Sequence, residues 1–157
     1  MSKPKVLFVC LGNICRSPTA EAVFRTRAQQ AGLDIEIESA GTGAWHAGEN
    51  PDPRTIEAGE MRGYSFAGQS ARAVDITDFA TFDYILAMDS QNLAHLEDIS
   101  PAGFSGHLGL FLSFDQNQSM TDVPDPYYGG ADGFETVLNL IEAASDGLIT
   151  ELKTRST

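Results

Sequence analysis

The sequence predicts an α/β fold: a doubly wound, parallel, four-stranded sheet with helices on both faces. Short apolar runs rich in Val, Ile, Leu and Phe are typical of strands that are buried on both faces. Longer stretches with helical periodicity separate these runs, as in sheets whose parallel strands are joined by crossover helices. The 157 residues, 42% of them apolar, suffice for a single domain over residues 1–157.

The first half of the chain predicts two strands and two helices. Residues 5–10 (KVLFVC) form a buried strand, and a helix then runs from Ser17 as N-cap, with Pro18 at its first helical position, to about residue 31. Residues 34–39 (DIEIES) alternate between polar and apolar and predict an edge or half-exposed strand. A loop over residues 50–54 leads to a short helix that ends near residue 63.

The second half predicts two further strands, each followed by other structure. Residues 82–88 (FDYILAM) form a buried strand, and a helix follows over about 90–96. Residues 107–113 (HLGLFLS) form the fourth strand, and the turn-rich residues 122–130 (DVPDPYYGG) form a loop. The last helix covers about 132–152, with an apolar stripe along one side.

The charge of the chain restricts its partners. The net charge is −12, and between Arg72 and Lys153 there are fourteen Asp and Glu residues but no Lys or Arg. Nucleic-acid binding needs a basic surface, so no nucleic-acid partner is predicted. No stretch approaches the ~20 apolar residues of a membrane span, and a cytoplasmic protein with no membrane partner is predicted. Any anion site must draw its positive groups from the N-terminal half.

The cysteines point to reactivity. Cys10 and Cys15 lie too close together to staple a secreted scaffold. The three histidines are scattered without the spacing of metal ligands, so no metal site is predicted. A thiol that serves as a nucleophile explains the cysteines better.

The stretch that carries the chemistry follows the first strand (CLGNICRSP). Doubly wound sheets bind ligands at the carboxyl ends of their strands, where Cys10 lies. A tight loop that opens into a helix offers backbone N–H groups to an anion, and Arg16 can hold two phosphate oxygens with its planar fork. The helix N-terminus and the guanidinium both favour a thiolate at Cys10. The hydroxyl of Ser17 can donate a hydrogen bond to that sulfur as well as cap the helix. The predicted phosphate-binding loop, between Cys10 and the helix, comprises Leu11, Gly12, Asn13, Ile14, Cys15, Arg16 and Ser17.

The same residues carry a family resemblance. CLGNICRSPTAE resembles the active-site signature of low-molecular-weight protein tyrosine phosphatases, and SAGTGAW at 39–45, FDYILAMD at 82–89 and DPYYGG at 125–130 resemble further segments of that family. The resemblance extends over nearly the whole chain. It implies tyrosine-phosphorylated protein substrates, phosphate or other oxyanions as product or inhibitor, and no cofactor.

The resemblance also implies catalytic roles. Cys10 attacks phosphorus to give a cysteinyl-phosphate, while Arg16 and the loop amides stabilise the transition state. Asp125, between two prolines, serves as general acid and then as general base. Tyr127 and Tyr128 form one wall of the substrate cleft.

The sequence allows two interpretations each for Trp45, Asp89 and Ser39. Trp45 is either a second wall of the cleft or a core residue, and Leu11 and Ile14 face the substrate ring. By resemblance Asp89 orients Arg16, but it can also cap the helix that follows it. Ser39 either braces the loop or is an ordinary residue at the end of a strand.

One position departs from the family. Many members carry a histidine just before the pair that corresponds to Ala71 and Arg72, where this chain has Gln69 two residues before Ala71. A hydrogen bond from that histidine to Asn13 is then either lost or made by Gln69.

Three other functions fit the sequence less well. A thioredoxin-coupled arsenate reductase shares the fold and loop but needs more cysteines than this chain has. A protein arginine phosphatase carries, by resemblance, a threonine where this chain has Ile14. A phosphotyrosine-binding module would not need every residue of the chemistry, and all of them are present.

Two hypotheses concern regulation and selectivity. Cys15 either forms a reversible disulfide with Cys10 or packs inside the loop. The acids after Arg72 predict that acidic phosphopeptides are disfavoured, with a modest effect at physiological salt.

Overall fold

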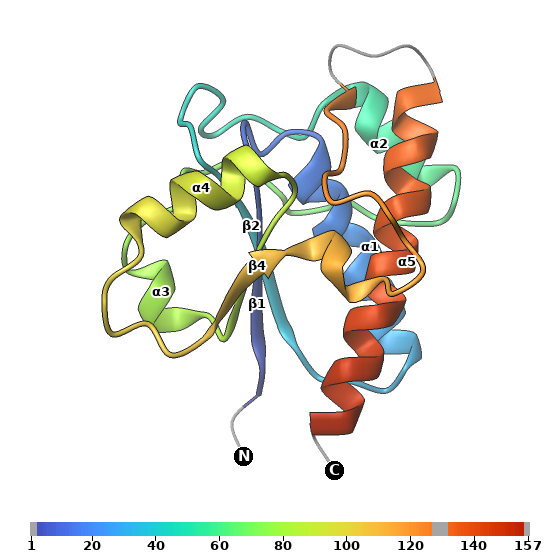
Figure 1. Ribbon diagram of the computed structural model, residues 1–157. Helices are drawn as coiled ribbons and strands as arrows, with labels where there is room; N and C mark the ends of the chain where they lie inside the picture. Colours follow the sequence, from blue (N-terminus) through green and yellow to red (C-terminus); the bar gives the residue numbers. More distant parts are fainter. Residues whose placement is uncertain (1–2, 127–131, 156–157) are drawn as a thin grey trace.

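Four parallel strands form the centre of the protein, as the computed structural model shows for residues 3–126 and 132–155 (Figure 1). Their order is β2-β1-β3-β4. They comprise β1 (Lys5–Cys10), β2 (Glu36–Gly41), β3 (Tyr84–Ala87) and β4 (His107–Leu110). β2 lies at an edge, as its alternating sequence predicts. The predicted four-stranded parallel sheet is therefore confirmed.

Helices cover both faces of this sheet. α1 and α5 lie side by side on one face, while α3 and α4 lie on the other (Figure 1). Their bounds are α1 (Arg16–Gln30), α2 (Pro53–Glu60), α3 (Asp78–Thr81), α4 (Ser90–Ile99) and α5 (Asp132–Arg155). Within the described residues, no helix is apolar over a length that would cross a membrane.

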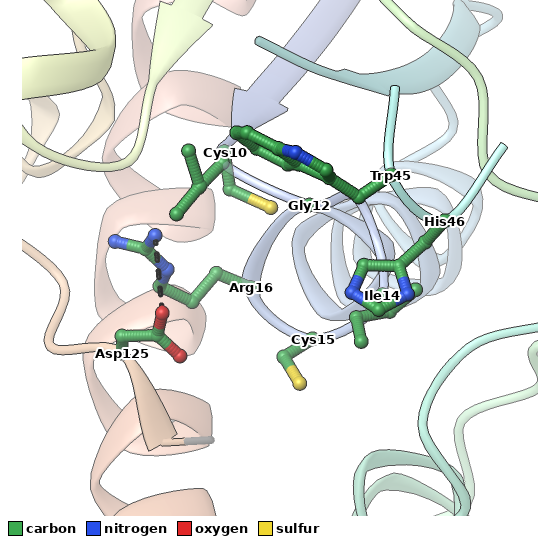
Figure 2. A pocket seen from close by; sticks show the side chains of 9 residues that line it. Cys10, Gly12, Ile14, Cys15, Arg16, Trp45, His46 and Asp125 are labelled. Atoms are coloured by element: carbon green, nitrogen blue, oxygen red, sulfur yellow. Dashed lines mark ion pairs between the residues drawn. The ribbon is translucent and has the colours of Figure 1, made fainter. Parts of the chain in front are cut away.

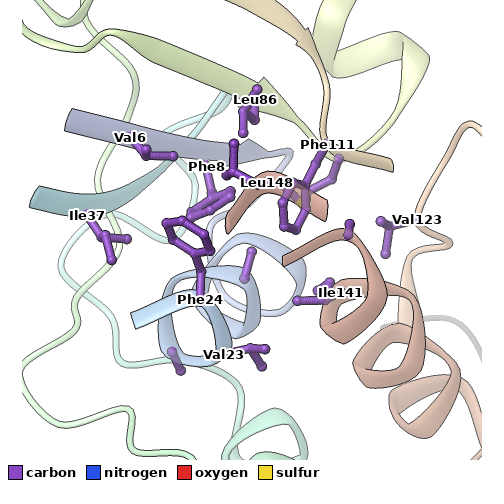
Figure 3. Packing of buried hydrophobic residues seen from close by; sticks show 14 of the residues in the cluster. Val6, Phe8, Val23, Phe24, Ile37, Leu86, Phe111, Val123, Ile141 and Leu148 are labelled. Atoms are coloured by element: carbon purple, nitrogen blue, oxygen red, sulfur yellow. The ribbon is translucent and has the colours of Figure 1, made fainter. Parts of the chain in front are cut away.

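β1 supplies side chains to two separate cores. Val6, Phe8 and Cys10 face the core under α1 and α5, whereas Leu7 and Val9 face the core under α3 and α4. The ring of Phe8 packs between those of Phe24 and Phe111, with centroids 5.6 and 4.8 Å away (Figure 3). Every residue from 6 to 10 is buried, which explains why this strand is an unbroken apolar run.

The strand order fixes where a ligand can bind. The chain passes from β1 to its neighbour β2 and then crosses back to β3 on the other side of β1. The connections after β1 and β3 therefore diverge at the carboxyl end of the sheet, which leaves a crevice there. Cys10, the last residue of β1, opens onto this crevice.

Some elements differ from the prediction. The fourth strand ends at Leu110 because β3, its partner, ends at Ala87. The chain then turns into a 3₁₀ helix, η1 (Phe111–Phe114), in which the hydroxyl of Ser113 donates to the carbonyl of Leu110. α3 was not predicted, since four residues are too few to show a helical period.

Candidate active site

The loop after β1 wraps around the sulfur of Cys10. The backbone N–H of Asn13 donates to Sγ at 3.3 Å, and the hydroxyl of Ser17 lies 3.0 Å from Sγ. A thiolate can only accept a hydrogen bond, so Ser17 donates when Cys10 is ionised. Asn13 has a left-handed backbone with φ of 57°, a conformation that Asn tolerates better than most residues. The loop is thus closed around the sulfur by local bonds.

The start of α1 differs from the prediction. The helix begins at Arg16, its N-cap is Cys15, and no side chain caps it. The prediction that Ser17 caps the helix is wrong, because its hydroxyl turns into the loop toward Cys10. Pro18 therefore lies within the first turn, where its missing N–H costs no helical hydrogen bond. Because no side chain caps this turn, its backbone N–H groups are available to bind an anion.

A buried network braces the loop through Asn13. The Nδ2 group of Asn13 donates to Ser17 at 2.8 Å and to Ser39 at 3.0 Å, and Oδ1 accepts from the backbone N–H of Arg72 at 3.0 Å. The hydroxyl of Ser39 in turn donates a hydrogen bond to Oε1 of Glu21 at 2.8 Å. The hydroxyl of Ser39 therefore contacts the loop directly, and both Nδ2 and Oδ1 of Asn13 have hydrogen-bond partners.

Gln69 does not take the place of the family's histidine at Asn13. Its Nε2 donates instead to the carbonyl of Pro18 at 3.2 Å. The backbone N–H of Arg72 donates to the side-chain oxygen of Asn13. Asn13 is therefore held in place without a histidine.

Arg16 lies buried between the loop and two acidic residues. Its Nη1 donates to Asp89 at 2.6 Å and to the carbonyl of Val123 at 3.1 Å, and its Nη2 lies 3.8 Å from Asp125. Burial opposes the charged guanidinium, but the neighbouring charge of Cys10, then Asp89 and Asp125, outweigh it and raise the pKa of Arg16. Arg16 therefore stays a cation in the pocket.

Asp89 plays both of the roles considered for it. One oxygen accepts from Arg16, and the other accepts from the backbone N–H of Asn92 at 2.7 Å as the N-cap of α4. Since a capped helix fixes the carboxylate, it also fixes the direction of the guanidinium.

Asp125 reaches the pocket from the far part of the chain. The segment before it is clamped to the end of β3, because Val123 N–H donates to the carbonyl of Met88 at 2.8 Å. Asp122 also accepts from the N–H and the hydroxyl of Ser90. The side chain of Asp125 is 32% exposed and faces Arg16 (Figure 2). Tyr127 and Tyr128, the predicted cleft wall, lie outside the described residues.

These side chains enclose a cavity of about 330 Å³ (Figure 2). Trp45 is 71% exposed, which excludes the interpretation as a core residue. Its ring packs so closely on Gly43 that a side chain at Gly43 would collide with it. The cavity is lined by Cys10, Leu11, Gly12, Ile14, Cys15, Arg16, Trp45, His46 and Asp125.

Comparisons with known proteins point to one family. Residues 5–157 match the family described as low molecular weight phosphotyrosine protein phosphatase. A Schizosaccharomyces pombe protein of that name is 50% identical over 133 residues, covering 83% of this chain and 85% of the relative. The chain belongs to this family. It is therefore a hydrolase of the protein-tyrosine-phosphatase kind.

Solved structures of related proteins have the same fold. A protein tyrosine phosphatase from Entamoeba histolytica, with Hepes in its active site, superposes with a TM-score of 0.93 at 41% identity over 99% of this chain and 100% of that chain. A Drosophila arginine phosphatase has a TM-score of 0.90 at 31% identity, over 95% and 98% of the two chains. The fold is thus similar in phosphatases named for different substrates.

Sequence reasoning missed His46 in this low-molecular-weight phosphatase. It was counted among scattered histidines, yet its ring lies in the pocket beside the phosphate loop (Figure 2). Its position directly after Trp45, in a segment that resembles the family, was a usable signal.

Cys15, the second thiol of the family loop, is buried and free, as is Cys10. Burial, reinforced by the charge of Asp52 and opposed by Thr55, raises the pKa of the Cys15 thiol to about 12. Packing inside the loop is therefore confirmed, while a disulfide with Cys10 stays a prediction.

The described part of the chain contains no group of three or more His, Cys, Asp or Glu side chains that could hold a metal ion.

Proposed function

We propose that this chain hydrolyses phosphotyrosine in proteins through a cysteinyl-phosphate, with residues 1–157 acting as a single phosphatase domain. One observation carries the proposal. The thiol of Cys10, the guanidinium of Arg16 and the carboxylate of Asp125 line the same cavity at the end of β1. Nucleophile, cationic clamp and proton donor are the three groups that phosphoryl transfer to a thiol requires.

In the first step Cys10 attacks the phosphorus of the bound ester. The Sγ–P bond forms while the bond from phosphorus to the phenolic oxygen breaks. Asp125 gives its proton to the leaving oxygen, so that tyrosine departs as a neutral phenol. The N–H of Asn13 and the hydroxyl of Ser17 contact the sulfur and hold it in position for the attack.

In the second step water attacks the phosphorus of the cysteinyl-phosphate. Asp125, now ionised, accepts a proton from this water, and the Sγ–P bond breaks. Inorganic phosphate leaves and the Cys10 thiolate is restored. Asp125 gives up one proton in the first step and recovers one in the second, so the enzyme returns to its starting state.

Arg16 and the backbone N–H groups of the loop balance the charge on the transferring phosphoryl group. Because Asp89 and Val123 already hold Nη1, the guanidinium needs little reorganisation when the ester binds. Phosphate and other oxyanions should occupy the same place as product or inhibitor. The Hepes in the active site of the Entamoeba protein supports this, since Hepes carries a sulfonate.

The pocket favours an aryl ester. Trp45, Leu11 and Ile14 present apolar surface above the loop, against which a phenyl ring can pack. Arginine phosphatase activity is the second candidate, favoured by the likeness to the Drosophila enzyme. Against it stands Ile14, whose side chain has no hydroxyl to bond a guanidino group.

The deciding experiment compares matched peptides that carry phosphotyrosine, phosphoserine or phosphoarginine. The phosphotyrosine peptide should have the highest kcat/KM, and Cys10→Ser should bind phosphate while losing turnover. A higher kcat/KM for phosphoarginine, or turnover that survives in Cys10→Ser, would overturn the proposal.

Asp125→Asn tests the proton donor. It should lower kcat/KM for phenyl phosphate by about 10²- to 10⁴-fold, since proton donation contributes that much and kcat/KM covers only the steps up to the release of the phenol. The loss should be much smaller on p-nitrophenyl phosphate, whose phenolate leaves without a proton. Equal losses on both esters would exclude Asp125 as the acid of the first step.

The predicted cytoplasmic location remains part of this proposal. Fractionation of cells that express the full chain would test it.

A further inference from the structure

The first turn of α4 contacts two parts of the pocket. Asp89, the N-cap of this helix, accepts from Arg16 at 2.6 Å. The next residue, Ser90, donates twice to Oδ1 of Asp122, from its backbone N–H at 3.0 Å and from its hydroxyl at 2.7 Å. Asp122 lies three residues before Asp125. Neighbouring residues of one helix therefore hold both the guanidinium and the segment that carries the proposed proton donor.

The backbone between Asp122 and Asp125 has little freedom. Val123 is buried, and its N–H donates to the carbonyl of Met88 at 2.8 Å. Pro124 has the φ that its ring imposes. Because so few torsions are free, the place of Asp125 depends directly on how Asp122 and Val123 are held.

The segment before Asp122 is more open to solvent. Residues 116–121 are mostly exposed and lie in neither a helix nor a strand. Stretches with few buried contacts are the ones that open most readily. Without the contact between Ser90 and Asp122, movement of this segment would be transmitted to Asp125 through Val123.

The helix α4 does not need Asp122 as its cap. The other oxygen of Asp89 already accepts from the backbone N–H of Asn92 at 2.7 Å and caps the helix. The bonds from Ser90 therefore hold Asp122 rather than start the helix. A carboxylate at the N-terminus of a helix is also favoured by the helix dipole, so this contact can persist although Ser90 is exposed.

We propose that Ser90 and Asp122 are positioning residues for proton donation. Their contact holds the backbone that leads to Asp125, and so keeps its carboxyl group beside Arg16 and within reach of the leaving oxygen. Neither residue is among the described residues that line the cavity, so both act through Asp125. The inference rests on the proposed function, since Asp125 is the proton donor of that mechanism.

The test measures how strongly hydrolysis depends on the leaving group. The measured quantity is the ratio of kcat/KM for p-nitrophenyl phosphate to kcat/KM for phenyl phosphate. p-Nitrophenolate leaves without a proton, whereas phenolate needs one, so poorer proton donation raises this ratio. Damage to Cys10, Arg16 or the phosphate loop slows both esters and largely cancels. The ratio thus separates a loss of proton donation from a general loss of structure.

Three variants assign the effect to the contact. Asp122→Ala removes the acceptor of both bonds and should raise the ratio about tenfold, less than the ~100-fold that a misplaced group can cost. Asp122→Asn keeps an oxygen that can accept the same bonds and should restore a ratio near that of the wild type. Ser90→Ala leaves the backbone N–H in place and should raise the ratio about threefold, as expected for one hydrogen bond.

Three further variants complete the test. The double variant with Ser90→Ala and Asp122→Ala should resemble Asp122→Ala, because Ser90 acts only through Asp122. Ser119→Ala changes an exposed serine on the preceding segment and should have the wild-type ratio. Asp125→Asn lacks the proton donor altogether and sets the upper limit of the ratio.

The outcomes distinguish this inference from the proposed function. If Asp125→Asn raises the ratio while Asp122→Ala does not, the inference is overturned and the proposed function stands. An equal loss of kcat/KM on both esters in Asp122→Ala would also overturn the inference, since the contact would then be only structural. If Asp125→Asn leaves the ratio unchanged, the proposed role of Asp125 fails and the inference fails with it.

Discussion

The floor of the pocket, residues 10–17, and its rim, Trp45 and His46, differ in how they are held. On the floor, Asn13 and Arg16 are buried and bonded to residues from distant parts of the chain. On the rim, Trp45 is largely exposed and His46 is held by a neighbour three residues away. A preorganised floor serves a transition state that does not vary, while an exposed rim can adapt to different substrates.

The largest effect should follow from a change on the floor. Arg16→Lys keeps a positive charge but loses the planar fork that bonds Asp89, Val123 and a phosphate at once. We expect kcat on p-nitrophenyl phosphate to fall about 10²- to 10³-fold. Steady-state kinetics would measure this, and a loss below about tenfold would mean that charge alone suffices there.

A smaller effect should follow from removing Ser39 from the hydrogen-bond network that holds Asn13, the brace of the loop. Ser39→Ala removes an acceptor from Asn13 and a donor from the buried Glu21. The free energy of unfolding should fall by about 1 to 3 kcal/mol, the cost of buried groups left without a partner. Urea unfolding would measure it, with the exposed Ser105→Ala as control. Equal stability of the two variants would show that the brace is dispensable.

The buried thiol of the floor should make the protein sensitive to alkali. Cys15 keeps its proton in the folded state until about pH 12, whereas the unfolded thiol ionises near its ordinary pKa of 9.0. The unfolded state therefore loses a proton first, and stability falls as the pH rises through that value. From about pH 8 to about pH 10 this costs about 1.4 kcal/mol.

Cys15→Ala should lack this contribution. Urea unfolding of both proteins at the two pH values isolates it, because every other titrating group is common to both. Parallel pH dependences would contradict the assignment.

The smallest effect should come from the rim. Trp45→Ala should raise KM for aryl phosphates about threefold with little change in kcat, because the ring packs on the substrate without touching the phosphorus. Met61→Ala removes an exposed apolar side chain outside the pocket and serves as the control. A fall in kcat at unchanged KM would place Trp45 with the floor instead.

The floor could be predicted from sequence better than the rim. A buried strand, a tight loop and the start of a helix are all local signals, and they predicted that Cys10 and Arg16 lie close together, as they do in the lining of one cavity. The contact between the hydroxyl of Ser17 and the sulfur of Cys10 was predicted correctly, but the capping role was not, because a serine before a proline has the local pattern of a cap. The partners of Ser17 also include the carbonyl of Ala40, far along the chain.

Contacts between distant segments set the limit of prediction. Asp89 and Asp125 were assigned by family resemblance, since no local pattern links them to Arg16. His46 was missed because its position depends on how residues 46–49 bond to Ala71, which a periodicity cannot show. α3 and the early end of β4 are short features that depend on their neighbours in space.

The clamp on Asp122 and Val123 has a practical consequence for engineering. Residues 116–121, just before it, are mostly exposed, while the clamp itself bonds to Ser90 and Met88. Extra length inserted there would be taken up ahead of the clamp and would leave Asp125 in register with Arg16. This stretch is therefore a suitable place to graft a recognition peptide, which would tether chosen substrates next to the catalytic pocket.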